Sequence, residues 1–263
     1  MKIFWAFARQ SFHSTAIHHF DFWVRVASFP VWMYSIRWVW MTLYTQRPGA
    51  FGVTLEQMVT YGVLGIAVQS IYFTGPQYYM ARQVRTGAID ADLMKPLDFH
   101  LHMLARSAGN MLFHLIALVF PAMLMGFFLF NLQPPANVVT SFLFTVALLL
   151  GFLVNFHLEF LLGSLALVTL EIHSIDWAFN ALSRFFAGQW VPLWLFPGIV
   201  GGLAQALPFK CIFDIPLSIY TGKITGSAVV QVIGFQLIWL VVLLAASRWA
   251  WRRIHTRLVV QGG

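Results

Sequence analysis

Long apolar runs limit the possible folds of this sequence more than any other feature. Each run is close to the roughly 20 residues that an α-helix needs to cross a lipid bilayer. The chain of 263 residues is 59% hydrophobic and only 10% charged, so it has too few polar side chains to cover a water-exposed surface. The sequence predicts a single all-α integral membrane domain over residues 1–263, with six transmembrane helices at 24–45, 55–75, 107–130, 138–156, 160–184 and 226–248.

A seventh apolar region, residues 188–217, contains prolines and glycines at short intervals. Proline removes a backbone donor and clashes with the preceding helical turn, so one straight helix cannot form there. Irregular backbone is tolerated at membrane depth only where protein or a wet cavity covers it. We expect two short helices that form a re-entrant hairpin before the last span. The interrupting residues are Pro192, Pro197, Gly198, Gly201, Gly202, Pro208 and Pro216.

The N-terminal segment and the basic residues predict how the chain lies in the membrane. Residues 1–23 are too polar to cross, and their aromatic and polar side chains fall on opposite sides of a helical wheel, which indicates an interfacial amphipathic helix. With the N-terminus in the cytoplasm, eleven lysines and arginines fall on the cytoplasmic side and four on the outer side. Because loops rich in these residues favour the cytoplasm, both termini are predicted to be cytoplasmic.

The sequence lacks the motifs of several enzyme classes. No G-x-x-x-x-G-K-[ST] phosphate loop and no H-E-x-x-H zinc motif occur. The single cysteine, Cys211, cannot form an internal disulfide or a thiolate metal site. An intramembrane hydrolase would need a serine such as Ser164 with a histidine such as His173, but no G-x-S-x-G turn is present. We expect no catalytic residues, no metal and no cofactor in this chain, and we assign its net charge of +7 to membrane orientation and lipid contact rather than to nucleic acid.

Three charged residues lie inside the predicted spans, away from their ends, where burial in hydrocarbon is costly. Arg37 lies in the first predicted span, and Glu171 and Asp176 lie in the fifth. One interpretation is structural: an ion pair, or side chains that reach the interface. The other is functional: a polar lining of a substrate path, or a seam between two subunits. The residues alone do not decide between them.

The segment QVRTGAIDADLMKPLDF, residues 83–99, is a charged interruption between two apolar runs. Gly87 is expected to end a helix that continues from the second span, and Asp90 to cap a new one. Pro96 stops that helix, and the spacing of Ile89, Leu93 and Leu97 predicts one apolar side. That side either rests on the membrane surface or docks on a soluble partner.

Three stretches of the sequence resemble ABC-2 type transporter permeases. VRTGAIDADLMKPL, residues 84–97, resembles the cytoplasmic segment of those proteins, although lysine stands at Lys95 where arginine is more usual. The Gly- and Pro-rich residues 188–216 resemble the region before their last span, and VVQGG at 259–263 resembles their closing residues. One departure is Leu167-Val168, where the family often has Phe-Trp.

This resemblance implies a function that the bare residues do not. Such permeases have six spans, an interfacial N-terminal helix and re-entrant helices, and they work as exporters in the cytoplasmic membrane of prokaryotes. Two permeases, identical or related, stand on two separate ATP-binding cassette subunits, which bind the ATP and Mg. An ATP-independent six-span channel or secondary transporter is the alternative. By the resemblance, coupling to the ATPase would fall on Arg85, Gly87, Ile89, Asp90, Leu93, Lys95 and Pro96.

Overall fold

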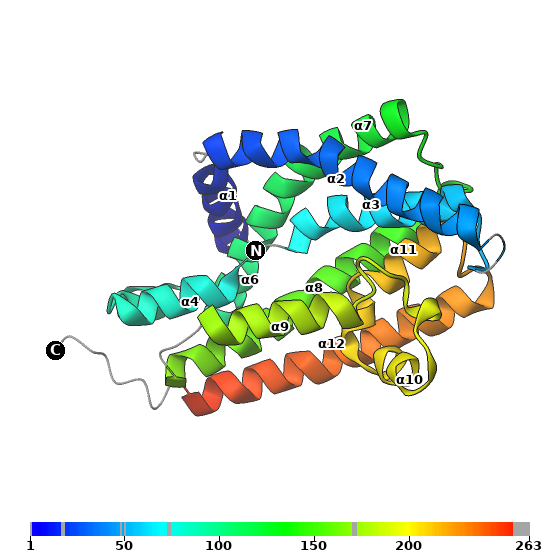
Figure 1. Cartoon of the computed structure of the whole chain (residues 1–263). Helices are drawn as coiled ribbons and strands as arrows, with labels where there is room; N and C mark the ends of the chain where they lie inside the picture. Colours follow the sequence, from blue (N-terminus) through cyan, green and yellow to red (C-terminus); the bar gives the residue numbers. More distant parts are fainter. Residues whose placement is uncertain are drawn as a thin grey trace.

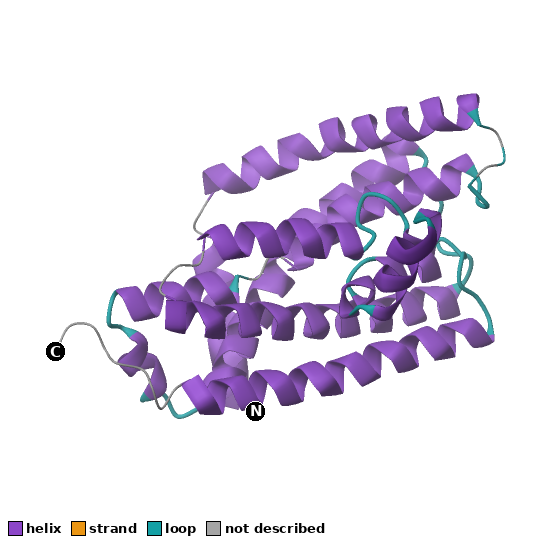
Figure 2. Cartoon of the chain, turned by 60° about the horizontal axis from the view of Figure 1, so that its bottom comes forward, coloured by secondary structure: helices purple, strands orange, loops and turns teal. Residues whose placement is uncertain are grey.

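The computed structural model describes residues 2–16, 19–47, 49, 51–72, 75–169 and 173–254. All regular elements in those residues are helices, as expected, and no strand occurs among them (Figure 2). The α-helices are α1 (Lys2–Ala16), α2 (His19–Gln46), α3 (Leu55–Tyr72), α4 (Pro76–Arg85), α5 (Ile89–Leu93), α6 (Phe99–His114), α7 (Phe120–Phe130), α8 (Val138–Thr169), α9 (His173–Phe186), α10 (Gly198–Ala206), α11 (Asp214–Tyr220) and α12 (Ser227–Ile254). A π-helical turn, η1 (Leu115–Val119), joins α6 to α7, and two 3₁₀ turns, η2 (Leu193–Leu195) and η3 (Pro208–Cys211), flank α10.

Four helical stretches in the described residues are long and apolar enough to cross a membrane: Leu55–Arg85, Phe99–Phe130, Val138–Leu165 and Ser227–Ile254. A fifth candidate is the pair Gly198–Ala206 and Pro208–Tyr220, which bends by 65°. Without the bent pair, the expected number of six is reached only if both α2 and α9 also cross. Helix α2 is long enough, but its tryptophans, tyrosines and two arginines lower its mean hydropathy.

The predicted boundary between the fourth and fifth spans is wrong. Residues 157–159 were expected to form a turn, but α8 runs through them without a break over 32 residues. The polar side chains there have partners inside the bundle. His157 is buried, and its Nδ1 lies 3.0 Å from the Ser247 hydroxyl of α12 and 3.3 Å from the His100 Nε2 of α6. The next helix, α9, has only 14 residues.

Helix α8 lies at the centre of the bundle (Figure 1), and α4, α11 and α12 pack against it. Helix α2 packs on α3, and α1 packs on α6. The α1–α6 contact is close because α6 has Gly109 there: a Cβ at that position would clash with the Ala8 carbonyl oxygen. Ser11 and Thr15 of α1 also donate hydrogen bonds to Asn110 Oδ1, at 2.7 and 2.8 Å.

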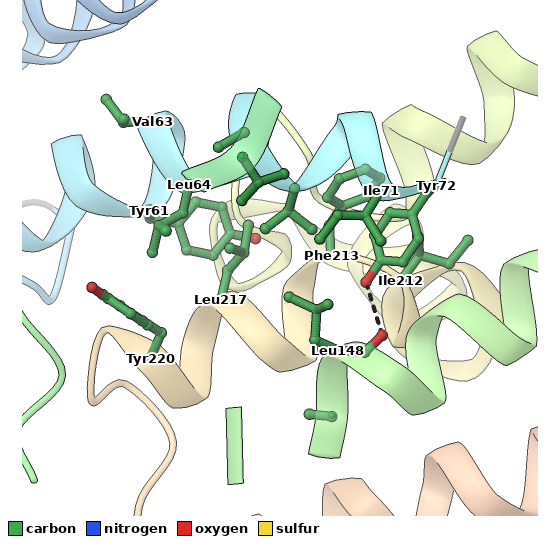
Figure 3. Close-up of a cluster of buried hydrophobic side chains, with 14 of the residues drawn as sticks. Tyr61, Val63, Leu64, Ile71, Tyr72, Leu148, Ile212, Phe213, Leu217 and Tyr220 are labelled. Atoms are coloured by element: carbon green, nitrogen blue, oxygen red, sulfur yellow. Dashed lines mark hydrogen bonds between the residues drawn. The ribbon is translucent and has the colours of Figure 1, made fainter. Parts of the chain in front are cut away.

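The main core forms where α3 meets the segment 211–220 and α8. In Figure 3, Tyr61, Leu64, Ile71 and Tyr72 of α3 face Ile212, Phe213 and Leu217, and the Tyr72 hydroxyl donates to the Leu148 carbonyl of α8 at 3.4 Å.

The proline- and glycine-rich region 188–217 forms the two expected short helices, α10 and α11, separated by η3. Proline and glycine prevent one continuous helix there. A buried side chain of the last helix bonds a carbonyl of the broken region: Gln236 Nε2 donates to the Cys211 carbonyl and also to the Ala147 carbonyl of α8, both at 2.9 Å. One amide thus joins α12, α8 and the broken region.

Candidate functional site

The segment between α4 and α6 has a defined start and end. Gly87 has a φ of +68°, a left-handed conformation that glycine adopts without steric cost, and it ends α4 as expected. Helix α5 follows over only five residues. The predicted cap is wrong by two positions: the N-cap is Ala88, and Asp90 lies in the first turn. Asp98 caps α6 instead, since its side chain accepts a hydrogen bond from the Leu101 N–H at 3.3 Å.

Asp92 is the polar anchor of this segment. It is only 2% exposed and accepts hydrogen bonds from Tyr79 Oη at 2.7 Å, Gln83 Nε2 at 2.8 Å and Lys95 Nζ at 2.5 Å. Burial alone would raise the pKa of this carboxyl, but the three hydrogen bonds outweigh that effect and hold the pKa below its ordinary value. Asp92 is therefore ionised at neutral pH and links α5 to α4.

Lys95 extends the same network to the N-terminal helix. Its Nζ lies 3.5 Å from His102 Nε2 on α6 and 5.4 Å from the ring centroid of Phe7 on α1. The Phe7 and His102 rings are 4.6 Å apart, and the Arg106 guanidinium lies 3.8 Å from the Tyr79 ring. A displacement of α5 would consequently be felt by α1, α4 and α6.

The expected apolar side of α5 is divided between the core and the surface. Ile89 is 2% exposed and packs in a cluster with Met80, Phe99, Met103, Phe156, Phe160 and Trp251. Leu93 is 43% exposed and the neighbouring Met94 is 83% exposed. Since α5 ends at Leu93, Leu97 lies beyond the helix and cannot continue its face. The prediction of one continuous apolar side is therefore wrong.

The remaining predicted coupling residues lie around this exposed tip. Arg85, Asp90 and Pro96 are exposed, and Lys95 is half-buried. Just beyond Pro96, Asp98 Oδ1 lies 3.9 Å from Arg248 Nη2 of α12, a surface ion pair. The predicted residues thus form a compact group, with Ile89 turned inward.

The three predicted intramembrane charges have different positions. Arg37 is half-buried on α2, and Glu171 lies outside the described residues. Asp176, in the first turn of α9, is buried and accepts hydrogen bonds from the Tyr78 hydroxyl and from Gln77 Nε2 at 3.0 Å. The structure does not bring Arg37 and Asp176 together in any contact among the residues it describes.

The sequence analysis missed two charged residues, Glu159 and Arg184. The predicted spans leave Glu159 in the gap between 138–156 and 160–184, and Arg184 is one of the four basic residues counted on the outer side. In the structure both line a small pocket of about 30 Å³ between α3, α8, α9 and the residues just before α11. The polar residues Asn155, His157 and Glu159, spaced two apart within an apolar run, were the signal that could have indicated a polar site inside the bundle. Among the described residues, no three histidine, cysteine or acidic side chains come together as a metal site.

Comparisons with known proteins place the chain in a family. Residues 31–262 match the family model described as ABC-2 family transporter protein. No curated protein and no solved structure matches the chain. The match covers most of the chain, from the middle of α2 through α12, so the resemblance found in the sequence is confirmed. The chain is a member of the ABC-2 family of transporter proteins.

Proposed function

We propose that this chain is the permease subunit of an ATP-binding cassette exporter, with its ATPase on a separate polypeptide that binds the ATP and Mg. Membership of the ABC-2 family and at least four helices able to cross a membrane support this proposal. The protein would form the translocation path in the cytoplasmic membrane of a prokaryote. It would act with two ATPase subunits and a second permease, of the same or a related sequence.

The proposed topology has six crossings with both termini in the cytoplasm. The crossings are α2, α3 with α4, α6 with α7, α8, α9 and α12, with the bent α10–α11 region on the outer side before α12. Because Arg184 lines an internal pocket, it no longer counts toward the outer loops. The outer side then has three basic residues, which strengthens the charge bias. Helix α1 would lie along the inner interface.

One observation carries the coupling role: a rigidly anchored segment presents an apolar tip. Ile89 and Asp92 fix α5 from the inside, while Leu93 and Met94 project outward. An exposed methionine beside a leucine suits an apolar groove on another protein, because methionine adapts its shape to a surface. Arg85 and Asp90 would supply a charged rim. We infer that ATPase movements push on this tip and reach α1, α4 and α6 through the network of Asp92 and Lys95.

The test uses the permease co-expressed with the ATPase from a neighbouring reading frame. Leu93→Glu and Met94→Glu, together, place two charges on the tip without touching the buried anchors. We expect normal membrane insertion but loss of co-purification and of ATPase stimulation. The matched control is Arg47→Glu, an exposed charge change at the far end of α2, which should leave both unchanged.

Two outcomes would contradict the proposal. Wild-type ATPase stimulation by the Leu93→Glu, Met94→Glu variant would remove the docking role. Transport in vesicles that needs an ion gradient and no ATP would favour the channel or secondary transporter instead.

A further inference from the structure

A pocket of about 430 Å³ lies between the start of α3, the loop after α7 and the end of α11. That volume is within the range of small-molecule sites. The pocket shares no residue with the small one around Glu159, and it lies at the end of the bundle opposite α4 (Figure 1). We call it the Tyr220 pocket, and its lining residues are Gln57, Thr60, Gln133, Pro134, Ala136, Tyr220, Thr221 and Gly222.

Hydrogen bonds between three chain segments hold the walls of the Tyr220 pocket. At the start of α3, the Thr54 N–H donates to Gln57 Oε1 at 2.9 Å and the Gln57 N–H donates to Thr54 Oγ1 at 3.2 Å, a reciprocal capping box. Gln57 Nε2 also donates to the Thr221 carbonyl at 3.0 Å. The Gln133 N–H donates to Thr60 Oγ1 at 3.2 Å. The loop after α7 and the turn after α11 are therefore both fastened to α3, and the pocket is preformed.

Tyr220 contributes a buried hydroxyl that has no hydrogen-bond partner among the described residues. The residue is 6% exposed, and its ring packs edge-on against Phe144 with 5.0 Å between the ring centroids. In Figure 3 the hydroxyl points away from Leu148 and Leu217 of the main core. A buried hydroxyl without a partner is costly. Because Tyr220 lines the pocket, a ligand that bonds this hydroxyl removes that cost.

Two other lining residues have hydrogen-bonding capacity to spare. The amide of Gln133 has two donor hydrogens and one acceptor, and this exposed side chain bonds to nothing else in the described part of the chain. The Thr60 hydroxyl accepts from the Gln133 N–H, and its own hydrogen has no acceptor among the residues described. Gln133, Pro134 and Gly222 are exposed, so the pocket opens to the surface.

The lining of the Tyr220 pocket has no charge, since none of its residues is acidic, basic or a histidine. A charged ligand would lose hydration there without meeting a counter-charge. Amides and hydroxyls both donate and accept hydrogen bonds, so they match a ligand made of similar groups. Pro134, Ala136 and the Tyr220 ring add apolar surface for the C–H groups of such a ligand.

We propose that the Tyr220 pocket binds a neutral sugar ring. A sugar ring has several hydroxyls, each a donor and an acceptor, around an apolar C–H frame, and the lining offers a partner for both kinds of surface. In the proposed topology the pocket opens on the outer side, because α3 starts and α11 ends there. That placement rests on the proposed permease function, whereas binding itself does not. The sugar belongs either to a soluble carbohydrate or to the headgroup of a glycolipid.

The test applies saturation-transfer difference NMR to the purified protein in phosphatidylcholine nanodiscs. The probes are the methyl glycosides of glucose, galactose, mannose and N-acetylglucosamine, and empty nanodiscs are the blank. We expect saturable binding of at least one glycoside. The corresponding uronic acid and amino sugar should bind at least about tenfold more weakly, because the pocket has no counter-charge for either.

Two variants test whether the glycoside binds in this pocket. Tyr220→Phe removes only a hydroxyl that has no partner to lose, so the protein should fold normally while the affinity falls about three- to tenfold. Ala136→Trp, at an exposed lining position, fills the pocket and should abolish binding. The matched controls are Tyr34→Phe, at an exposed tyrosine of α2, and Val138→Trp, at an exposed position outside the lining. Both should bind the glycoside as the wild type does.

A glucosyl or galactosyl diacylglycerol added to the nanodiscs separates the two sources of the sugar. Displacement of the methyl glycoside by this lipid indicates a headgroup site, and no displacement indicates a site for soluble carbohydrate.

The inference is overturned if no glycoside gives a signal above that of empty nanodiscs, or if the charged sugars bind as well as the neutral ones. Unchanged affinity in Tyr220→Phe or in Ala136→Trp would also overturn it. These failures are distinct from failure of the permease function. ATPase stimulation without glycoside binding would remove only the site, and glycoside binding without ATPase stimulation would remove only the proposed coupling.

Discussion

Replacing Asp92 with alanine should loosen the coupling segment while leaving the bundle folded. The substitution removes the acceptor of three hydrogen bonds, from Tyr79, Gln83 and Lys95. The anchor of α5 to α4 is lost, but the apolar cluster around Ile89 remains. Local opening of residues 85–98 should therefore become more frequent, with little effect on α8 or α12.

The size of the effect follows from the exposure of the partners. The Lys95 side chain is 30% exposed, so its ion pair contributes at most about 1 kcal/mol. The hydrogen bonds from Tyr79 and Gln83 to a buried carboxylate contribute about 1.5 kcal/mol each. The two hydrogen bonds together account for about 3 kcal/mol of the local opening free energy, so their loss raises the open population roughly a hundredfold.

Hydrogen exchange followed by mass spectrometry measures this opening directly, because the exchange rate tracks the open population. Peptides from residues 85–98 should exchange up to about a hundredfold faster in Asp92→Ala. Asp90→Ala, an exposed position on the same helix, is the control and should change exchange less than about threefold. The reasoning is refuted if both variants exchange alike, or if peptides of α8 accelerate as much as the segment does.

Three further predictions concern acid, the α1 contact and the buried amide. The pKa of Asp92 is lowered in the folded state, so its stabilising contribution is present at neutral pH and is lost only as the pH falls below about 4. Hydrogen exchange of residues 85–98 should therefore stay constant between pH 5 and 8 after correction for intrinsic rates. Gly109→Ala forces a Cβ against the Ala8 carbonyl, and this clash should destabilise the α1–α6 contact by about 1–3 kcal/mol. Proteolysis of α1 should become faster. Gly234→Ala, where nothing lies within 4 Å of the added Cβ, is the control and should leave that proteolysis unchanged. Gln236→Leu removes the donor to two buried carbonyls and should lower the free energy of unfolding by about 1–3 kcal/mol, measured by urea or SDS titration; an unchanged midpoint would show that water replaces the amide.

The sequence predicted the elements whose signals are local. Apolar runs of sufficient length located α3, α8 and α12 in outline, and Gly87 marked the end of α4 because its left-handed φ suits glycine best. These features depend on hydropathy and on backbone sterics, which can be read from a short window. The family resemblance came from motif order, and the family match later confirmed it.

The continuity of α8 could not be read in the same way. Asn155, His157 and Glu159 look like the polar start of a turn, but each lies inside the bundle. Asn155 donates to a carbonyl of α3, and His157 lies against Ser247 of α12. Partners this distant in sequence leave no local signal, so tertiary contacts override the polar pattern.

The division of α5 had a different cause. A spacing of four residues predicts a common face only while the helix lasts, and α5 ends at Leu93. Ile89 alone reaches the core, and Leu93 and Met94 point outward. The orientation of a helix this short is set by its buried side chains, here Ile89 and Asp92. The periodic pattern through residues 89–97 therefore did not predict which residues would be buried.

The composition of α2 has a consequence for how the protein is made. In the proposed topology α2 crosses the membrane, yet it is not among the stretches apolar enough to cross alone. Arg37, a charged side chain within the helix, disfavours its partition into lipid. Its packing partner α3 is far more apolar. We therefore expect the translocon to retain α2 until α3 emerges from the ribosome, and the two helices to enter the bilayer as a hairpin.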